Sequence, residues 1–162
     1  MKVTQVTTRA LSTPAGNPLV VGLPEPTDKR EFVLLELGTD QGLVGIGLTF
    51  FGGALTPALR AAVDGLARLT IGMDPSQVEA IAAKCRRMAG SSGPGGIFAL
   101  ALSAVDMACW DLMGKAAGRS VCALLGGLRD RAPTYASGAL MRQHLEEFAA
   151  RAARFYATTS DA

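Results

Sequence analysis

The spacing of apolar residues changes near residue 53. Before that point, apolar and polar residues alternate or form short β-prone runs, and they predict strands over residues 2–11, 31–37 and 43–50. The loop Thr39-Asp40-Gln41-Gly42 joins the second and third runs and is typical of a hairpin. We therefore expect a three-stranded antiparallel sheet, which needs a helical layer against one face.

Beyond residue 53 the apolar residues recur at helical spacing. The pair Thr56-Pro57 predicts a helix with Thr56 as its N-cap, and Gly72 predicts the end of that helix. Residues 74–77 (Asp-Pro-Ser-Gln) have the arrangement of a capping box, which predicts the start of a second helix.

The second helix is expected to bury one stripe of side chains and to expose another. The inner stripe is Val78, Ile81, Cys85 and Met88, and the outward residues are Lys84, Arg86 and Arg87. A glycine-rich connector over residues 90–96 leads to the most apolar segment, residues 97–116, which should be the central helix of the layer. Ser120 is expected to cap a short helix that ends at Gly126-Gly127.

The end of the chain predicts a different arrangement. A short strand is expected over residues 134–137 and an amphipathic helix over residues 146–156. One such βα unit cannot bury a parallel strand on both faces, so we expect it to begin a larger parallel structure. The predicted organisation is an α+β domain over residues 1–130, followed by a single βα unit over residues 131–162.

Composition excludes several classes of protein. The net charge is +2 in 162 residues, without a basic patch, so a nucleic-acid partner is not expected. No uninterrupted apolar run approaches the ~18–20 residues of a membrane span, and the amino terminus lacks a signal-peptide core. The three cysteines, Cys85, Cys109 and Cys122, include no CxxC pair. We therefore expect no disulfide framework and a reducing, cytoplasmic location.

Most residues that could carry chemistry have a simpler structural interpretation. His144, the sole histidine, has no acid-base partner at a suggestive spacing. Asp106 and Asp111 point about 140° apart on a helix and cannot share a metal, whereas Asp111 and Lys115 are spaced as an i,i+4 ion pair. The stretch 90–96 lacks the ending of a phosphate-binding loop. A weaker alternative makes the chain a small enzyme that uses Cys85 or Cys122 as its nucleophile.

The run Phe50-Phe51-Gly52-Gly53 lies where the strands give way to helices. Two adjacent aromatic side chains on an extended backbone point in opposite directions, so both cannot enter one core. We expect one of them to project from this corner, where it could contact a ligand or a neighbouring domain.

A longer pattern resembles a known family. Residues 101–115 read A-x-S-A-x-D-x-A-x-W-D-x-x-G-K and are followed by L-L-G-G over residues 124–127. This pattern resembles the signature of the mandelate racemase/muconate lactonizing enzyme family of the enolase superfamily. The hairpin and the helices that follow Thr56 also resemble its amino-terminal capping domain. Cys109 stands where the family more often has leucine or alanine.

The resemblance implies a capping domain followed by a TIM barrel that holds Mg²⁺. Such enzymes remove the proton next to a substrate carboxylate and act as racemases, acid-sugar dehydratases or cycloisomerases. The family's two closing loops match residues 16–26 and 49–53, and its first barrel strand matches residues 133–137. The resemblance gives the following substrate-loop candidates: Phe50, Phe51, Gly52 and Ser137.

The catalytic inventory departs from the family pattern. A complete barrel takes ~250 residues, whereas 30 residues follow Ala132, and all four lysines precede it. The carboxylates after Asp130 are Glu146, Glu147 and Asp161, and none lies in a strand pattern. We therefore expect the cap and first βα unit alone, with no catalytic residues and no tight Mg²⁺ site.

Two consequences follow for the chain by itself. It should be inactive on the carboxylate substrates of the family. An alternative role is a non-catalytic module that forms a homo-oligomer or pairs with full-length paralogues. Surfaces that would otherwise pack on a barrel should face water and favour self-association.

Overall fold

The computed structural model describes residues 1–14, 29–50, 53–129, 131–133 and 153. The sheet and helices belong to one compact unit, residues 1–13 and 31–128, and residues 14–30 and 129–162 form a second unit. The expected strand over residues 134–137 lies outside the described residues. So does the helix expected over residues 146–156, apart from residue 153.

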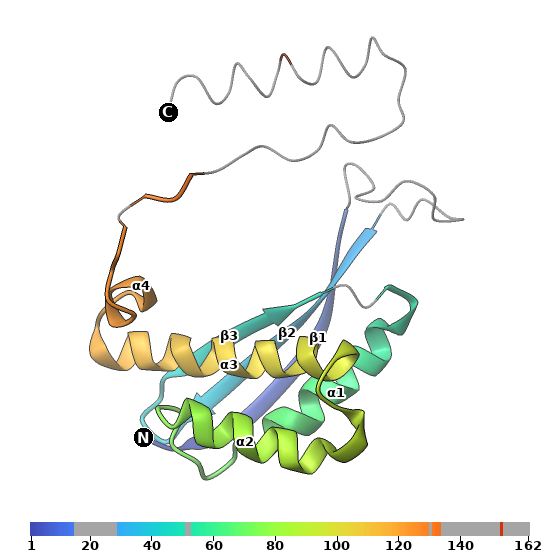
Figure 1. The fold of residues 1–162 in the computed structure, drawn as a ribbon, viewed down its shortest axis with the longest axis horizontal. Coiled ribbons are helices and arrows are strands. Elements are labelled where there is room, and N and C mark those ends of the chain that lie inside the picture. The colour runs from blue at the N-terminus through green and yellow to red at the C-terminus, as the bar shows by residue number, and fades with distance from the viewer. Residues whose placement is uncertain (15–28, 51–52, 130, 134–152, 154–162) are drawn as a thin grey trace. The chain divides into compact units, whose positions relative to one another are not determined.

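The three predicted strands form one antiparallel sheet, as expected. They are β1 (Val3–Pro14), β2 (Lys29–Thr39) and β3 (Val44–Thr49), in the order β1-β2-β3 (Figure 1). β2 and β3 pair with Leu35 opposite Gly47. The hairpin turn is closed by the Thr39 N–H, which donates to the Leu43 carbonyl at 3.0 Å. Gly42 has a φ of 76°, a conformation that favours glycine.

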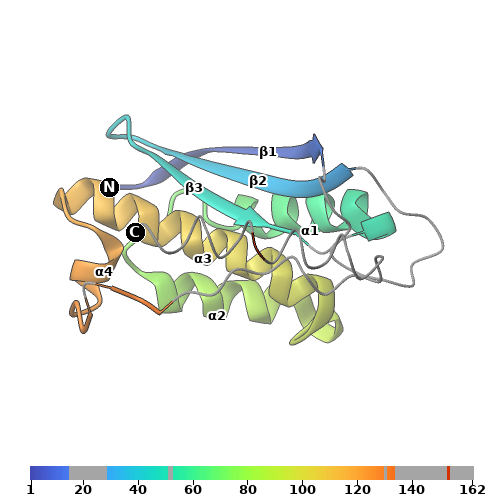
Figure 2. The same cartoon turned by 90° about the horizontal axis from the view of Figure 1, so that it is seen from above.

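In residues 53–129, four helices follow the sheet and lie on one side of it (Figure 2). They are α1 (Thr56–Arg68), α2 (Val78–Ala89), α3 (Gly96–Ala117) and α4 (Val121–Leu124), with short 3-10 turns η1 (Gly53–Leu55) and η2 (Gly90–Ser92). α1 and α3 lie next to the strands, and α2 lies beyond α3. α3 packs mainly on β3 and α1, and α2 packs on α3. This central position of α3 is the one predicted from its apolar sequence.

The core lies between the sheet and the helices. β2 contributes Val33, Leu35 and Leu37, all fully buried. α1 contributes Leu59 and Val63, and α3 contributes a stripe of buried residues: Ala101, Ala104, Val105, Ala108, Cys109 and Leu112. Each large aliphatic side chain buried in this way stabilises the fold by about 1.5–3 kcal/mol relative to its exposed state.

The length and apolar composition of α3 differ from the expectation that no segment is long and apolar enough to span a membrane. Over an 18-residue window its mean hydropathy is 1.5, so α3 is long and apolar enough to do so by length and composition alone. The central helix of a compact domain meets the same criterion. α3 has eight buried residues and packs on β3 and α1, so its apolar composition is explained by the core of this domain.

The predicted N-cap of α1 is wrong by one residue. Leu55 occupies the N-cap position and makes no side-chain capping bond, while Pro57 lies in the first turn as expected. Thr56 is the first helical residue, and its hydroxyl donates to the Gly53 carbonyl at 2.8 Å. The hydroxyl therefore closes the preceding 3-10 turn instead of accepting from the helix.

The predicted capping box of α2 is also wrong. α2 begins at Val78, with Gln77 at the N-cap position and no side-chain capping bond. Asp74 instead accepts the Ser76 N–H at 2.9 Å, and its carbonyl accepts the Gln77 N–H. Asp74 thus stabilises the turn before the helix, a use of aspartate that competes with capping.

Two further details differ from the pattern-based expectation. α1 ends at Arg68, four residues before Gly72, whose N–H donates to the Val3 carbonyl at 2.8 Å. On α2, Met88 is 62% exposed and not part of the inner stripe. Lys84 is half-buried, because its ammonium donates to the Leu69 carbonyl at 2.7 Å just beyond α1. A cation at that position satisfies a carbonyl that the helix leaves unpaired.

Ser120 confirms the expected cap of the short helix. Its hydroxyl oxygen accepts the Ala123 N–H at 3.2 Å, and α4 then ends at Leu124, just before the predicted Gly126-Gly127 stop.

Candidate functional site

The first part of the candidate site is the end of the sheet at which β3 stops. Because adjacent strands run in opposite directions, β1 ends and β2 begins toward the same side of the sheet, beyond the point where β3 stops opposite Val33 (Figure 1). The expected closing loops, residues 16–26 and 49–53, connect to these strand ends. The whole of the first loop lies outside the described residues.

Phe50 is the substrate-loop candidate that the structure describes. It follows β3 directly and is 39% exposed. Its ring lies 6.0 Å from that of Phe32, with the two planes tilted by 55°. Such a tilted pair is a favourable aromatic contact and orients Phe50 on the sheet. The other candidates, Phe51, Gly52 and Ser137, lie outside the described residues.

The second feature is the close packing of α3 on β3. A Cβ atom at Gly45 would overlap the carbonyl oxygen of Ala108, and a Cβ atom at Gly47 would overlap that of Ala104. Two glycines on the inner side of β3 therefore let the helix backbone lie directly on the strand. The small side chains of Ala104 and Ala108 in the family signature fit this approach from the helical side.

The third feature is the exposed edge of β3, where α3 supplies side-chain partners. The Asp111 carboxylate accepts the Ile46 N–H at 2.8 Å. The Lys115 ammonium donates to the Val44 carbonyl at 2.7 Å, and it pairs with Asp111 at 2.6 Å. The expected Asp111–Lys115 ion pair is therefore confirmed, and the two side chains also bind backbone groups that an edge strand leaves open.

These contacts explain much of the signature as structural. Ala104 and Ala108 face the glycines of β3, and Asp111 and Lys115 bind its edge. A Cβ atom at Gly114 would lie 3.0 Å from the carbonyl oxygen of Arg119. Glycine at this position therefore leaves room for the chain that follows the end of α3. Sequence reasoning found the ion pair but missed its backbone partners, which are 65 and 71 positions away.

The acidic side chains offer little for metal binding. In the described part of the chain, no three His, Cys, Asp or Glu side chains gather at one point. Partial burial raises the pKa of Asp106, and the negative charge of Glu79 adds to the effect. Mg²⁺ takes oxygen ligands in octahedral geometry, usually from carboxylates together with water, and no structural observation places Asp106 and Glu79 at one such site. We therefore assign no chemical step through Mg²⁺ to the described residues.

Two of the three cysteines are poor candidates for chemistry. Cys85 and Cys109 are buried, and Cys122 is exposed. Burial raises the pKa of the Cys85 thiol, and burial together with Asp106 raises that of Cys109 to about 12. A nucleophilic cysteine requires a thiolate near neutral pH, so the buried position of Cys85 argues against the alternative that makes it a nucleophile.

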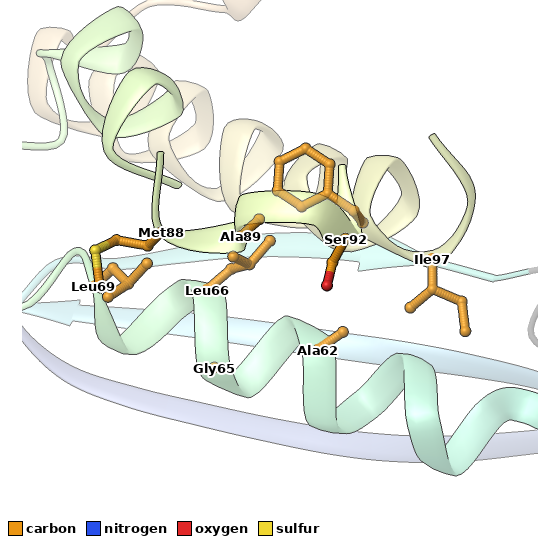
Figure 3. A pocket seen from close by; sticks show the side chains of 9 residues that line it. Ala62, Gly65, Leu66, Leu69, Met88, Ala89, Ser92 and Ile97 are labelled. Atoms are coloured by element: carbon orange, nitrogen blue, oxygen red, sulfur yellow. The ribbon is translucent and has the colours of Figure 1, made fainter. Parts of the chain in front are cut away.

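A pocket of about 560 Å³ lies between α1, the end of α2 and the start of α3 (Figure 3). Its walls are formed by Ala62, Gly65, Leu66, Leu69, Met88, Ala89, Ser92, Ile97 and Phe98. Ser92 provides the one polar side chain among these lining residues. A catalytic pocket needs several convergent polar groups, so this hollow has the composition of a gap between helices.

Comparison with known proteins supports the interpretation of the signature. Residues 3–126 match the family model described as the mandelate racemase/muconate lactonizing enzyme, N-terminal domain. D-galactarolactone cycloisomerase from Agrobacterium fabrum (strain C58) is 35% identical over 149 residues. The match covers 90% of this chain and 38% of the cycloisomerase, so the chain spans about two-fifths of the length of that relative.

Solved structures show the same likeness. A member of the enolase superfamily from Polaromonas sp. JS666 has a TM-score of 0.83 and 34% identity, over 97% of this chain and 42% of that one. L-talarate dehydratase from the same organism, complexed with Mg and L-glucarate, has a TM-score of 0.82 and 28% identity. That match covers 94% of this chain and 43% of the dehydratase.

The family match covers the sheet, α1 to α4 and the signature helix whose contacts were described above. This chain therefore belongs to the mandelate racemase/muconate lactonizing enzyme family of the enolase superfamily, and residues 3–126 are its amino-terminal domain.

Proposed function

We propose that this chain supplies the capping domain of a magnesium-dependent enzyme that acts on acid sugars, either a dehydratase or a cycloisomerase. The observation that carries the proposal is the match of residues 3–126 to the family's amino-terminal domain. The similarity to a D-galactarolactone cycloisomerase and to an L-talarate dehydratase supports this substrate class. The substrate would be a small polyhydroxy carboxylate, handled in the cytoplasm.

In this proposal the chain divides into a capping domain over residues 1–130 and the beginning of a barrel over residues 131–162. The cap would contribute Phe50, Phe51 and Gly52 to the cover over a bound substrate, and the beginning of the barrel would contribute Ser137. Phe50 is suited to this role because it is partly exposed at the sheet end and is oriented by Phe32. An aromatic lid residue would exclude water from the reacting carbon.

We further propose that this chain alone has no catalytic activity. The described part of the chain brings together no three metal-ligand side chains, which supports this proposal. The intact enzyme would remove the proton next to the substrate carboxylate with a base and metal ligands that we do not assign to these residues.

Proton exchange tests this proposal directly. The purified chain is incubated in D₂O with Mg²⁺ and a panel of aldonates and aldarates, and loss of the α-proton signal is followed by NMR. We expect no exchange above a sample containing EDTA, and metal-dependent exchange would overturn the inactivity. A full-length relative serves as the positive control for the panel.

A second candidate function is a non-catalytic module that pairs with full-length paralogues. The exposed apolar side chains on β3 favour it, since such side chains commonly mark interaction surfaces. Co-expression of the tagged chain with a full-length relative should then yield a stable complex of both polypeptides. Recovery of the tagged chain by itself would count against this function.

A further inference from the structure

The pocket between α1, α2 and α3 results from the way these helices pack. α1 and α2 both pack on α3, whereas neither packs extensively on the other. α2 reaches the end of α1 through Lys84, whose ammonium donates to the Leu69 carbonyl at 2.7 Å. The gap that remains between the two helices is the pocket of about 560 Å³. The side chains of the described helices leave this space unfilled.

The walls of the pocket are apolar and uncharged. Among the described residues that line it, none carries a charge and Ser92 is the one polar side chain. Leu66, Leu69 and Ile97 are half-buried and pack against the core beneath. An apolar ligand that covers their remaining surface would gain free energy in proportion to the area removed from water. Pockets of about 300–1,000 Å³ with apolar walls and few polar groups are typical of sites for small molecules.

Two side chains of this pocket are free to adapt to a ligand. The Ser92 hydroxyl makes no hydrogen bond to another described residue, and it points toward α1 (Figure 3). Met88 is 62% exposed, and a methionine side chain is flexible and polarizable enough to follow the shape of an apolar ligand. In Figure 3, Met88 and Leu69 lie toward one end of the pocket and Ile97 toward the other, with Ser92 between them. The hydroxyl can therefore bind one polar group while apolar walls extend to both sides.

Gly65 keeps the α1 side of the pocket open. It lies inside α1, where glycine is less favourable than alanine, and it is exposed. A Cβ atom at Gly65 would meet nothing within 4 Å. Close packing within the domain therefore does not require glycine here, and a larger side chain would project into the pocket.

We propose that this pocket binds a neutral, mainly aliphatic small molecule that carries one hydroxyl or carbonyl group. The polar group would hydrogen-bond to Ser92, and the apolar body would lie along Leu66, Leu69 and Ile97. A carboxylate would bind less well, because the lining offers no positive charge to offset its loss of water. Acid sugars have the opposite character, since they are charged and rich in hydroxyl groups. The proposal is therefore independent of the acid-sugar chemistry proposed above.

The first test titrates the full chain with 1-octanol and follows the side-chain methyl groups by NMR. Methyl signals of Leu66, Met88 and Ile97 should shift in a saturable way, with a dissociation constant below about 1 mM. Octanoate at pH 7 has the same chain length but a negative charge, and it should bind at least about tenfold more weakly. Absence of saturable shifts, or equal affinity for octanoate, would overturn the proposal.

The second test fills the pocket. Gly65→Leu should weaken 1-octanol binding at least about tenfold, because the new side chain occupies the space of the ligand. Ala83→Leu is the matched control, since Ala83 is an exposed residue of α2 outside the pocket lining. It should bind 1-octanol like the wild-type chain. Unchanged affinity in Gly65→Leu would place the alcohol elsewhere and contradict the assigned site.

The third test examines the polar contact. Ser92→Ala should weaken 1-octanol binding about five- to tenfold, because the alcohol then loses its hydrogen-bond partner. Ser91→Ala is the control, since Ser91 is also exposed but does not line the pocket. Equal affinity in these two variants would show that Ser92 does not orient the ligand.

Circular dichroism and urea unfolding of each variant check that the domain is folded. A ligand that binds only the folded chain also raises its melting temperature, so 1-octanol should stabilise Ala83→Leu more than Gly65→Leu. An aldonate should shift none of the pocket methyl signals. Failure of 1-octanol to bind would leave the proton-exchange result unchanged, so this proposal and the proposed function can fail separately.

Discussion

The carboxylate of Asp111 on α3 accepts the backbone N–H of Ile46 on β3 at 2.8 Å. The same carboxylate holds Lys115, whose ammonium donates to the Val44 carbonyl. Asp111 and Lys115 of the family signature therefore stabilise the edge strand β3. The bonded residue Ile46 precedes Asp111 by 65 positions in the sequence. The signature's acidic and basic residues at these positions support the fold and have no assigned part in catalysis.

Asp111→Ala should destabilise the domain by about 1–3 kcal/mol, because it leaves the Ile46 N–H and the Lys115 charge without their partner. The specific readout is hydrogen exchange at the Ile46 amide, which should accelerate more than that of neighbouring core amides. Asp64→Ala is the matched control, since Asp64 forms a similarly exposed pair with Arg68 but binds no strand-edge amide. Equal Ile46 exchange in both variants would contradict this role.

Gly47→Ala should destabilise the domain by about 3 kcal/mol or more, because the added methyl group would meet the Ala104 carbonyl of α3. Urea unfolding of the purified variant measures the change. Gly65→Ala provides the control within α1, where a Cβ atom meets nothing within 4 Å. Gly65→Ala should be neutral or stabilise the domain by up to about 1 kcal/mol. A larger loss of stability in Gly65→Ala than in Gly47→Ala would contradict the prediction.

Stability should depend on Asp64 in the acid range. The hydrogen bond from Arg68, aided by that from Thr8, holds the pKa of Asp64 below its ordinary value of 3.8. A carboxyl with a lowered folded-state pKa adds stability above its unfolded pKa and loses it as the pH falls through the folded value. The stability difference between wild type and Asp64→Asn should therefore be largest near neutral pH and shrink below 3.8. Urea titrations at several pH values test this, and a constant difference would refute it.

Thiol labelling should distinguish the three cysteines. Cys122 is exposed, whereas Cys85 and Cys109 are buried and their pKa values are raised. In the native protein at pH 8, iodoacetamide should modify Cys122 and leave the other two intact, and all three should react in urea. Mass spectrometry of tryptic peptides identifies the sites, with Cys122→Ser as the control. Rapid native labelling of Cys85 would revive its role as a nucleophile.

The element types follow from the sequence because they depend on local periodicity. Alternation predicted the strands, and helical spacing predicted α1, α2 and α3, with boundaries that differ by a few residues. The Asp111–Lys115 pair was predictable for the same reason, since residues four apart on a helix are neighbours. The apolar composition of α3 indicated its central place between β3 and α1.

Local periodicity does not predict which residue caps a helix, because a capping side chain has several backbone groups within reach. Thr56 and Asp74 have the residue types of N-caps, yet each binds the turn that precedes its helix. Lys84 looked like an outward residue and instead meets a carbonyl beyond α1, and Met88 lies outside the buried stripe. These choices depend on how neighbouring elements approach one another.

The sequence by itself determined the order of strands and helices, the central apolar helix and the likeness to a family. Each of these depends on the local spacing of residues and on their types. Only the tertiary structure decided why β3 needs Gly45 and Gly47, which backbone groups Asp111 and Lys115 satisfy, and which face of the sheet the helices leave uncovered. The physical reason is that close packing and edge protection join residues more than fifty positions apart, and their distances exist only after the chain has folded.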